Sequence, residues 1–322
     1  MKAIISNKYG SPEVLELKEV ENPIPDDNQV LIKIYAASLN YGNLVLLKGK
    51  PFLARFAFGL VKPKYSIPGG DISGRIESVG KNIKHFKPGD EVFGDLSGSG
   101  WGGFAEYVTV SEHVLVRKPS NISYEEAAAV PMAATTALQS LRDKGKIKPG
   151  QKVLINGASG GVGTFAVQIA KSFGAVVTGV CSTRNLDIVQ SIGADNVIDY
   201  TKEDFTKNME HYDLILAVNG FQPILAYKRS LSPNGNYVMV GGSGAQLTQA
   251  MILGPWLSKI GSKKLGNFLQ RPSQDDLIFI KELIELGKIK PVIDRSYKLS
   301  EIPNAFRYFD EGHTQGKIVI TM

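Results

Sequence analysis

A cluster of glycines carries the clearest chemical signal in the sequence. In LINGASGGVGTFAVQIAKSFG, residues 154–174, an apolar run leads into a glycine-rich turn and then into a stretch with helical spacing. The first backbone amides of a helix are unpaired and carry the positive end of the helix dipole, so they favour an anion. Glycines in the turn let the backbone approach that anion closely. The segment therefore predicts a phosphate-binding loop at a helix start.

The spacing within this loop matches the dinucleotide-binding fingerprint. Its three small-residue positions fall at Ala158, Gly160 and Gly163, and the alanine replaces the usual first glycine of the tight turn. Gly160 allows close approach of a pyrophosphate, and Gly163 allows the helix to pack closely on the strand. Because the loop follows a strand and opens a helix within a β-α-β pattern, we expect a bound dinucleotide.

The end of the next strand bears on which dinucleotide binds. The sequence there is GVCSTRN, with Cys181 at the position where an acidic residue would accept hydrogen bonds from the ribose hydroxyls. Ser182 and Arg184 can instead donate hydrogen bonds to a ribose 2′-phosphate, which a carboxylate would repel. We therefore expect NADPH rather than NADH as the cofactor. The alternative is that Ser182 only caps the next helix and that Arg184 is solvated.

Length, composition and charge limit the class of protein. The chain has 322 residues, of which 43% are hydrophobic and 21% charged, as in globular proteins of more than one domain. The amino terminus lacks the pattern of a signal peptide and no uncharged run is long enough to cross a bilayer, so we expect a cytoplasmic protein without an integral membrane segment. The net charge of +6 is scattered rather than gathered in a basic block, so no nucleic-acid partner is expected.

Metal and covalent chemistry have little support in the sequence. Cys181 is the only cysteine, and the four histidines, His85, His113, His211 and His313, show no ligand spacing. A zinc site needs three or four cysteine, histidine or carboxylate ligands, so we expect no metal. No Ser/His/Asp set, carboxylate pair or activated cysteine is evident, which argues against hydrolytic chemistry.

The amino-terminal part of the chain is predicted to be rich in β-strands. From residue 2 to about 118, short alternating runs are separated by proline, glycine and aspartate, the pattern of an antiparallel unit. Ser123 and Glu126 have the spacing of a capping box and predict a helix start, and Pro131 interrupts the helical stretch that follows.

The pattern changes from residue 151 onward. Apolar strands alternate with helix-length segments, among them KEDFTKNME at residues 202–210, and this alternation predicts a parallel sheet covered on both faces. The last helical segment and the strand KIVIT, residues 317–321, do not continue the alternation. We expect them to return to the first domain.

In their order along the chain, these segments resemble the medium-chain dehydrogenase/reductase superfamily, in its zinc-free, quinone oxidoreductase-like branch. The resemblance covers essentially the whole length, through GDISGRIESVG, FKPGDEVFG, GGFAEYVTV, KPGQKVLINGASGGVGTFAVQIAK, IGADNVIDY and the closing GKIVI. It implies an α/β fold in which a GroES-like β-rich domain accompanies a Rossmann domain with a doubly wound parallel sheet. We expect the GroES-like catalytic domain at residues 1–122, completed by 268–322, and the Rossmann NADPH-binding domain at residues 123–267.

The same resemblance implies roles for single residues. Asn40 and Thr136 match positions that approach the nicotinamide ring and its ribose. The residues matching the pyrophosphate loop are Ser159, Gly160, Gly161, Val162 and Gly163, and those matching 2′-phosphate contacts are Ser182, Arg184 and Tyr200. Positions that border the cofactor cleft are matched by Gly241, Gly242, Ser243, Asn267 and His313. Each has a purely structural alternative, such as a strand end for the glycines or a helix cap for His313.

Departures from the zinc-dependent branch point to a reaction without a metal. Asn40 stands where zinc alcohol dehydrogenases carry a cysteine ligand, and Gly69, Gly70 and Asp71 stand where they carry Gly-His-Glu. Without a Lewis acid, oxidation of a simple alcohol loses its main electrostatic aid. Hydride transfer to a quinone or an α,β-unsaturated carbonyl (an enone or enal) needs only a hydrogen-bond donor for the developing oxyanion.

We therefore expect a zinc-independent, NADPH-dependent oxidoreductase with a hydrophobic carbonyl or quinone substrate. Tyr41, directly after Asn40, is the candidate donor, although it can equally be an aromatic residue packed in a loop. The alternative function is an NADPH-binding protein with weak or no catalysis that serves as a redox-sensing or structural partner. The resemblance also implies a homodimer, formed through the edge strand near SKKLGNF.

The segment LLKGKPFLARFAFGLVKPKYSIP, residues 46–68, is apolar, aromatic and basic. It predicts either a lid or wall over a hydrophobic substrate or an exposed patch that meets a membrane or a partner. The interspersed charges favour the lid, because a membrane-binding helix confines its charges to one face.

Overall fold

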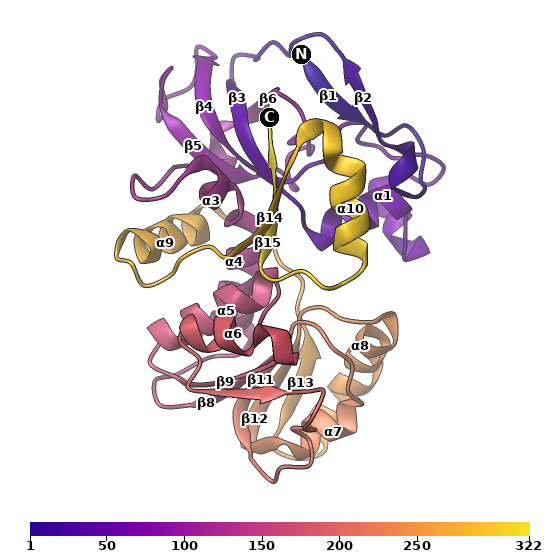
Figure 1. Cartoon of the computed structure of the whole chain (residues 1–322), viewed down its shortest axis with the longest axis vertical. Helices are drawn as coiled ribbons and strands as arrows, with labels where there is room; N and C mark the ends of the chain where they lie inside the picture. Colours follow the sequence, from indigo (N-terminus) through magenta and orange to yellow (C-terminus); the bar gives the residue numbers. More distant parts are fainter. The chain divides into compact units, whose positions relative to one another are not determined.

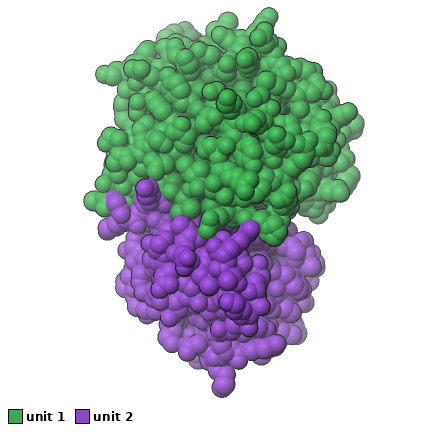
Figure 2. All heavy atoms as spheres, viewed as in Figure 1, with its two compact units in different colours: residues 1–135, 271–286, 291–322 green, residues 136–270, 287–290 purple.

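The computed structural model describes all 322 residues, and the chain divides into two compact units, coloured green and purple in Figure 2. The first unit comprises residues 1–135, 271–286 and 291–322, and the second comprises residues 136–270 and 287–290. The division falls inside helix α4 (Pro131–Gln139). Both ends of the chain therefore belong to one unit.

The first unit is built on a seven-stranded sheet with the order β14-β15-β3-β4-β5-β7, in which β6 also pairs with β3. Neighbouring strands in this sheet are antiparallel, except for the parallel pair β14 and β15. Strands β1 and β2 form a separate antiparallel pair. The strands are β1 (Lys2–Ile5), β2 (Glu16–Glu19), β3 (Gln29–Ser38), β4 (Asp71–Val79), β5 (Glu91–Asp95), β6 (Tyr107–Ser111), β7 (Leu115–Arg117), β14 (Ile293–Lys298) and β15 (Lys317–Thr321).

The helices of the first unit complete its core. Phe306 is fully buried and meets Phe104 edge to face, with 6.2 Å between the ring centres, so the carboxyl-terminal helix in yellow in Figure 1 helps to close the core. The helices are α1 (Tyr41–Lys48), α2 (Arg55–Phe58), α3 (Tyr124–Ala128), α9 (Gln274–Glu285) and α10 (Ile302–Asp310). Short 3₁₀ turns lie at Pro12–Val14, Phe52–Ala54, Glu112–Val114 and Leu299–Glu301.

The predicted capping box is confirmed. The backbone N–H of Ser123 donates to the carboxylate of Glu126 at 2.9 Å, and the N–H of Glu126 donates to the Ser123 hydroxyl at 3.2 Å. These two bonds satisfy amides that have no partner inside helix α3. Pro131 then begins α4, because a proline at the first helical position loses no hydrogen bond.

The second unit is a six-stranded parallel sheet with the order β10-β9-β8-β11-β12-β13. Numbered along the chain, this is the 3-2-1-4-5-6 order of doubly wound dinucleotide-binding folds. Its strands are β8 (Lys152–Asn156), β9 (Val176–Cys181), β10 (Asn196–Asp199), β11 (Tyr212–Ala217), β12 (Leu231–Met239) and β13 (Lys264–Asn267). Both predicted parts of the fold, the GroES-like β-rich part and the Rossmann parallel sheet, are confirmed.

Four helices connect the parallel strands. They are α5 (Gly161–Ser172), α6 (Leu186–Ser191), α7 (Ile224–Arg229) and α8 (Gly244–Lys259). A π-helical turn at Ser140–Lys144 follows α4, and a 3₁₀ turn at Thr183–Asn185 precedes α6. Right-handed crossovers that run in opposite directions from β8 and β11 put α5 and α6 on one face and α7 and α8 on the other, as Figure 1 shows.

One predicted helix is wrong. Residues 202–210 form turns between β10 and β11 instead of a helix. The carboxylate of Asp204 accepts from the backbone N–H of Thr206 at 3.0 Å and from its hydroxyl at 2.8 Å, while Met209 has a φ of 58°. Short polar side chains that bond nearby backbone groups compete with helix formation, and a left-handed residue ends it.

Candidate active site

The glycine-rich loop joins β8 to α5, and the space available for a side chain differs among its glycines. Gly157 has a φ of 90°, and a Cβ there would lie 2.7 Å from the Asn219 nitrogen. A Cβ on Gly163 would overlap the carbonyl oxygen of Gly157, so only glycine allows this approach of helix to turn. A Cβ on Gly160 would meet no atom closer than 3.7 Å. The open space beside the backbone at Gly160 is what a bound diphosphate requires.

The tight turn lies one residue earlier than the sequence spacing suggests. The spacing predicts the turn at Ala158, but the left-handed conformation occurs at Gly157, and Ala158 is a fully buried residue whose methyl lies 3.0 Å from where a Cβ on Gly179 of β9 would be. The alanine methyl therefore packs against the neighbouring strand, and the glycine before it makes the turn. Gly160 precedes the first residue of α5 in an extended conformation, so the amides of the first helical turn have no partner within the helix.

Asn185 links this loop to the end of the next strand. Its side-chain amide donates to the Ser159 hydroxyl at 2.9 Å and to the Ser182 hydroxyl at 3.3 Å, and Asn185 is itself buried. Asn185 is not among the residues predicted from the sequence. The signal available for it was an asparagine directly after the predicted phosphate-binding residues in GVCSTRN.

The residues predicted to meet a 2′-phosphate lie at the carboxyl ends of two adjacent parallel strands. Ser182 and Arg184 follow β9, Tyr200 follows β10, and the Tyr200 N–H donates to the Cys181 carbonyl at 3.0 Å. Arg184 and Tyr200 are exposed, and Ser182 is half-buried. The structure therefore brings these three residues to the carboxyl-terminal edge of the sheet of the second unit.

Two neighbouring groups shape the electrostatics of this edge. Burial and, to a smaller extent, the charge of Asp199 raise the pKa of the Cys181 thiol to about 11, so the thiol is not an activated nucleophile. Hydrogen bonds, first from Thr183 and then from Thr201, lower the pKa of Asp199 to about 2. Asp199 is therefore ionised at neutral pH, and Lys202 lies 3.6 Å away as its counter-charge.

The remaining predicted residues of the second unit lie near strand ends, except Thr136, which lies in α4. Gly242 has a φ of 120°, and the Ser243 hydroxyl caps α8 by accepting from the Gln246 N–H at 3.2 Å. Gly241 directly precedes them, Asn267 is the last residue of β13, and Thr136 is a buried residue of α4. Gly242 thus provides a left-handed turn, and Ser243 provides the N-cap of α8.

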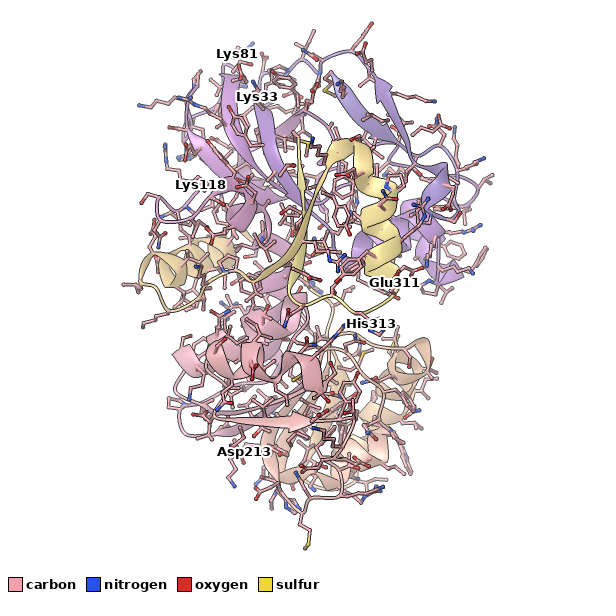
Figure 3. The ribbon with its side chains drawn as sticks, in the orientation of Figure 1. Lys33, Lys81, Lys118, Asp213, Glu311 and His313 are labelled. Carbon is pink, nitrogen blue, oxygen red and sulfur yellow. The ribbon has the colours of Figure 1, made fainter.

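Three predicted residues belong to the first unit instead. Asn40 directly precedes α1 and Tyr41 is its first residue, with 65% of the Tyr41 side chain exposed. His313 lies in the loop after α10, beyond Glu311, as Figure 3 marks.

Asn40 takes part in a buried network with two opposite charges. Its Nδ2 donates to Oδ2 of Asp71 at 2.8 Å, and its Oδ1 accepts a short hydrogen bond from Nζ of Lys317. The Nζ of Lys317 lies 3.6 Å from Oδ2 of Asp71. Asp71 is 0% exposed and Lys317 is 3% exposed, so both charges are removed from water.

Burial dominates the protonation of this pair. It raises the pKa of Asp71 to about 7, although the ammonium of Lys317 and the hydrogen bond from Asn40 oppose the shift, and the nearby Asp95 adds to it. Burial likewise lowers the pKa of Lys317, against the attraction of Asp71. Lys317 is not among the residues predicted from the sequence, although a lysine in the otherwise apolar strand KIVIT could have indicated it.

An aromatic ring fills the space beside Gly70, which stands in place of a zinc-ligand residue, and beside Gly42, which follows Asn40 by two positions. A Cβ on Gly70 would lie 3.3 Å from the indole of Trp101, and a Cβ on Gly42 would lie 3.2 Å from it. Trp101 is 4% exposed, and the ring of Phe58 meets it edge to face at 6.1 Å. Nowhere in the chain do three or more His, Cys, Asp or Glu side chains gather as a group that could hold a metal ion.

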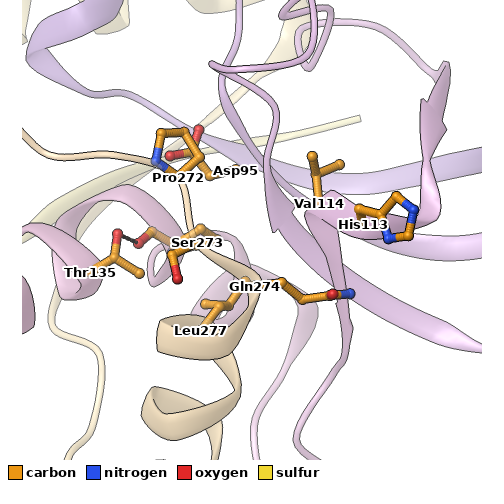
Figure 4. A pocket seen from close by; sticks show the side chains of 9 residues that line it. Asp95, His113, Val114, Thr135, Pro272, Ser273, Gln274 and Leu277 are labelled. Atoms are coloured by element: carbon orange, nitrogen blue, oxygen red, sulfur yellow. Dashed lines mark hydrogen bonds between the residues drawn. The ribbon is translucent and has the colours of Figure 1, made fainter.

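A small cavity lies elsewhere in the first unit, beside the start of α9 (Figure 4). It has a volume of about 50 Å³, and its lining includes Asp95, His113 and Gln274. Ligand pockets usually measure roughly 300–1,000 Å³, so this cavity is too small for a dinucleotide or a quinone.

The segment 46–68 presents apolar side chains on the surface of the first unit. It contains the end of α1, the 3₁₀ turn at Phe52–Ala54 and helix α2. Phe52 is 62% exposed, Leu53 75%, Phe56 69% and Val61 90%. Arg55 is held over the ring of Tyr9, with 4.4 Å between the guanidinium carbon and the ring centre. The apolar side chains of this segment are therefore exposed on the surface of the first unit.

Comparison with known proteins gives matches along the chain. The family described as "Alcohol dehydrogenase GroES-like domain" matches residues 26–120, and the family described as "Zinc-binding dehydrogenase" matches residues 192–320. The second match does not include positions 40 and 69–71, where zinc ligands occur in zinc alcohol dehydrogenases. No helix combines the length and apolarity that a bilayer span requires.

Full-length relatives are found as well. The chain is 36% identical to a chloroplast envelope quinone oxidoreductase homolog of Arabidopsis thaliana, covering 99% of this chain and 98% of the relative. It is also 36% identical to a 2-methylene-furan-3-one reductase of Solanum lycopersicum, covering 99% of this chain and 79% of that one. Among solved structures, the quinone oxidoreductase of Coxiella burnetii matches with a TM-score of 0.87 and 30% identity, covering 100% of this chain and 99% of that one.

Proposed function

Because this chain belongs to the medium-chain dehydrogenase/reductase superfamily, in its zinc-free, quinone oxidoreductase-like branch, we propose that it is a zinc-independent NADPH-dependent oxidoreductase. Its proposed reaction transfers hydride to a quinone or to an α,β-unsaturated carbonyl compound. The observation that carries the proposal is the open backbone at Gly160, together with the Asn185 amide that joins Ser159 of this loop to Ser182 at the end of β9.

The residues of the second unit would bind the cofactor. Amides of the first turn of α5 face the pyrophosphate, helped by the helix dipole, and the missing side chain at Gly160 allows the approach. Ser182, Arg184 and Tyr200 bind the 2′-phosphate, and Cys181 holds the position at the end of β9 that an acidic residue would occupy in an NADH-binding site. Thr136, Gly241, Gly242, Ser243 and Asn267 are the further contacts that we propose from the family resemblance.

The residues of the first unit would act at the reacting end. NADPH supplies the hydride, and negative charge then develops on the carbonyl or quinone oxygen. We propose that the exposed hydroxyl of Tyr41 donates a hydrogen bond to this oxygen, while Asn40 and His313 contact the cofactor. A delocalised enolate or hydroquinone anion needs less stabilisation than an alkoxide does, which fits a chain without a metal-ligand cluster.

Two relatives support the acceptor class. One is named a quinone oxidoreductase homolog, and 2-methylene-furan-3-one, the substrate in the name of the other, is itself a conjugated ketone. Both kinds of acceptor take hydride at a position conjugated with an oxygen. This shared chemistry is why we propose quinones and enones together.

The test is a cofactor titration followed by an acceptor screen on the purified protein. We expect NADPH to bind more tightly than NADH and to be oxidised in the presence of quinones or enones. If NADPH binds tightly and no acceptor is reduced, the alternative role of a redox-sensing or structural NADPH-binding protein replaces the enzymatic one. Tighter binding of NADH would contradict the cofactor assignment.

We further propose a homodimer formed along the second unit. Strand β13 is an edge of the six-stranded sheet, and an edge strand needs a cover or a partner. On helix α8, Met251 is 56% exposed, Ile252 67% and Trp256 60%. Light scattering on the purified protein tests this proposal, and a monomer at micromolar concentration would contradict it. The cytoplasmic location stays an expectation from the sequence.

A further inference from the structure

The side chain of Asn40 is held at both ends by buried charges. Its Nδ2 donates to the carboxylate of Asp71 at 2.8 Å, and its Oδ1 accepts from the ammonium of Lys317. The two charges come from β4 and β15, the strands that pair with β3 on its two sides. A reversed amide would put its N–H against the ammonium and its oxygen against the carboxylate. Only one orientation of the Asn40 amide is therefore compatible with both partners.

Each charge is itself fixed by further hydrogen bonds. Nζ of Lys317 also donates to the Leu39 carbonyl at 3.0 Å. The Asp71 carboxylate accepts from the Ser38 hydroxyl at 3.2 Å and from the Met132 backbone N–H at 3.1 Å. These partners include a backbone carbonyl just after β3 and a backbone N–H of α4. Asp71 and Lys317 are therefore held in place, and neither can move to match a different orientation of the Asn40 amide.

Stability alone does not account for this arrangement. Removing two opposite charges from water costs free energy that their attraction often fails to recover, and an apolar pair of similar volume is frequently as stable. The surrounding positions of the same strands hold fully buried apolar residues such as Ile72 and Ile318. The charges therefore have a role besides packing, and the group that they share is the Asn40 amide.

That amide retains one unused donor. The backbone N–H of Asn40 donates to Oδ1 of Asn43 at 2.8 Å, and one Nδ2 hydrogen goes to Asp71. The second Nδ2 hydrogen makes no hydrogen bond within the chain. Because the Oδ1 atom accepts from a cation, the amide is polarised and its N–H groups are stronger donors.

We propose that Asp71 and Lys317 are positioning residues that hold the Asn40 amide in one orientation, with its second N–H directed to the reacting end of the cofactor, and that hydride transfer depends on this orientation. The catalytic part of this inference rests on the proposed function, and the structural part does not. Neither residue touches the cofactor or the acceptor; both act through Asn40.

The structural part is tested by crystal structures of the ligand-free protein and of its variants. In Lys317→Met, where a methionine of similar volume removes the ammonium, we expect the Asn40 amide to leave its position beside Asp71. In Asp71→Asn, we expect the amide to turn or to occupy two positions. An Asn40 side chain that keeps the wild-type position in both variants would overturn the inference.

The catalytic part is tested with the double variant Asp71→Asn, Lys317→Met. Removing both charges leaves no unpaired buried ion, so the double variant should recover much of the thermal stability that either single variant loses. We expect kcat to remain about 10–100-fold below wild type, with the NADPH dissociation constant changed less than about 3-fold. The deuterium isotope effect with NADPH labelled at C4 should rise, because hydride transfer becomes slower. Activity that returns together with stability would show a merely structural pair.

The control is an ion pair on the surface of the same unit. Arg307 and Glu13 lie 3.0 Å apart, with about half of each side chain exposed. Glu13→Gln, Arg307→Met makes the same change in charge and should leave kcat and the isotope effect at wild-type values. If wild-type protein with bound NADPH reduces no acceptor, the proposed function fails, and the crystal structures still decide whether Asp71 and Lys317 orient Asn40.

Discussion

The Asn185 side-chain amide donates to the Ser159 hydroxyl at 2.9 Å, joining the turn after β9 to the glycine-rich loop after β8. The same amide donates to the Ser182 hydroxyl at 3.3 Å. One buried asparagine therefore connects the loop predicted to bind the pyrophosphate with the turn predicted to bind the 2′-phosphate. Its removal should disturb the binding of any dinucleotide.

Asn185→Ala is expected to weaken the binding of NADPH and of NADH by a similar factor. Loss of a buried hydrogen bond typically costs about 1 kcal/mol, which is roughly a 5-fold change in affinity. Ser159 belongs to the loop that both dinucleotides share, so the ratio of the two affinities should change little. Fluorescence titration with each cofactor measures this. Asn196→Ala, an exposed position at the other end of β10, is the control and should bind both cofactors normally. Unchanged binding by Asn185→Ala would show that this link does not shape the site.

Arg184→Ala should discriminate between the two cofactors. A charge-assisted hydrogen bond to a phosphate is worth roughly 1.5–3 kcal/mol, so the affinity for NADPH should fall about 10–100-fold. The affinity for NADH, which has no 2′-phosphate, should change less than about 2-fold. The same titration measures both values, with the exposed Arg229→Ala as a control for net charge. Equal weakening of the two cofactors would refute the phosphate assignment of Arg184.

Alanine substitutions at two glycines of the loop should have different effects, one on stability and the other on cofactor binding. In Gly163→Ala the new methyl overlaps the Gly157 carbonyl oxygen, so we expect a loss of roughly 1–3 kcal/mol in the free energy of unfolding. In Gly160→Ala the methyl meets nothing closer than 3.7 Å, so stability should stay within about 1 kcal/mol of wild type. Its affinity for dinucleotide should nevertheless fall at least about 10-fold, because the methyl occupies the approach of the diphosphate. Melting temperatures and cofactor titrations measure both effects, and tight cofactor binding by Gly160→Ala would contradict the assignment.

The buried carboxyl of Asp71 should make stability depend on pH. Its pKa in the folded protein is raised from 3.8 to about 7, so its contribution to stability is fully present below pH 4 and is lost as the pH rises through 7. The free energy of unfolding of wild type minus that of Asp71→Asn should therefore decrease between pH 4 and 7. Lys317 and Asp95 are the charged groups that influence this carboxyl.

Urea unfolding at several pH values measures this difference. Asp310→Asn, which removes a carboxylate from an exposed ion pair with Lys48, is the control. Its difference from wild type should lack the decline between pH 4 and 7. A difference between wild type and Asp71→Asn that is constant over this range would show that the Asp71 carboxyl titrates normally.

The exposed aromatic residues of segment 46–68 predict a selective effect on substrate size. If Phe52 and Phe56 form part of a lid over a hydrophobic acceptor, Phe52→Ser, Phe56→Ser should raise KM for a long-chain quinone about 10-fold and leave KM for a small quinone unchanged. Ile24→Ser, which changes an 88% exposed side chain of the same unit, is the control. Unchanged KM values, together with loss of binding to anionic lipid vesicles, would favour the membrane-contact alternative.

The sequence by itself determined those features that depend on local patterns. Apolar strands in alternation with helical segments give a parallel sheet because both faces of each strand must be covered. The capping box at Ser123 and Glu126 and the start of α5 at Gly161 follow from hydrogen bonds between residues close in the chain. The same local approach failed at residues 202–210, where Asp204 and Thr206 bond to each other instead of extending a helix.

Only the tertiary structure decided which groups meet across the sheets. Lys317 bonds Asn40 from 277 positions away, because β15 returns to pair with β3. The sequence contained both residues, but no pattern relates them, and whether a charge in a strand is solvated or buried depends on what packs over it. The turn at Gly157, the link from Asn185 to Ser159 and the Trp101 ring beside Gly70 likewise depend on distances between segments. Such distances are set by the packing of the whole unit, and no local preference encodes them.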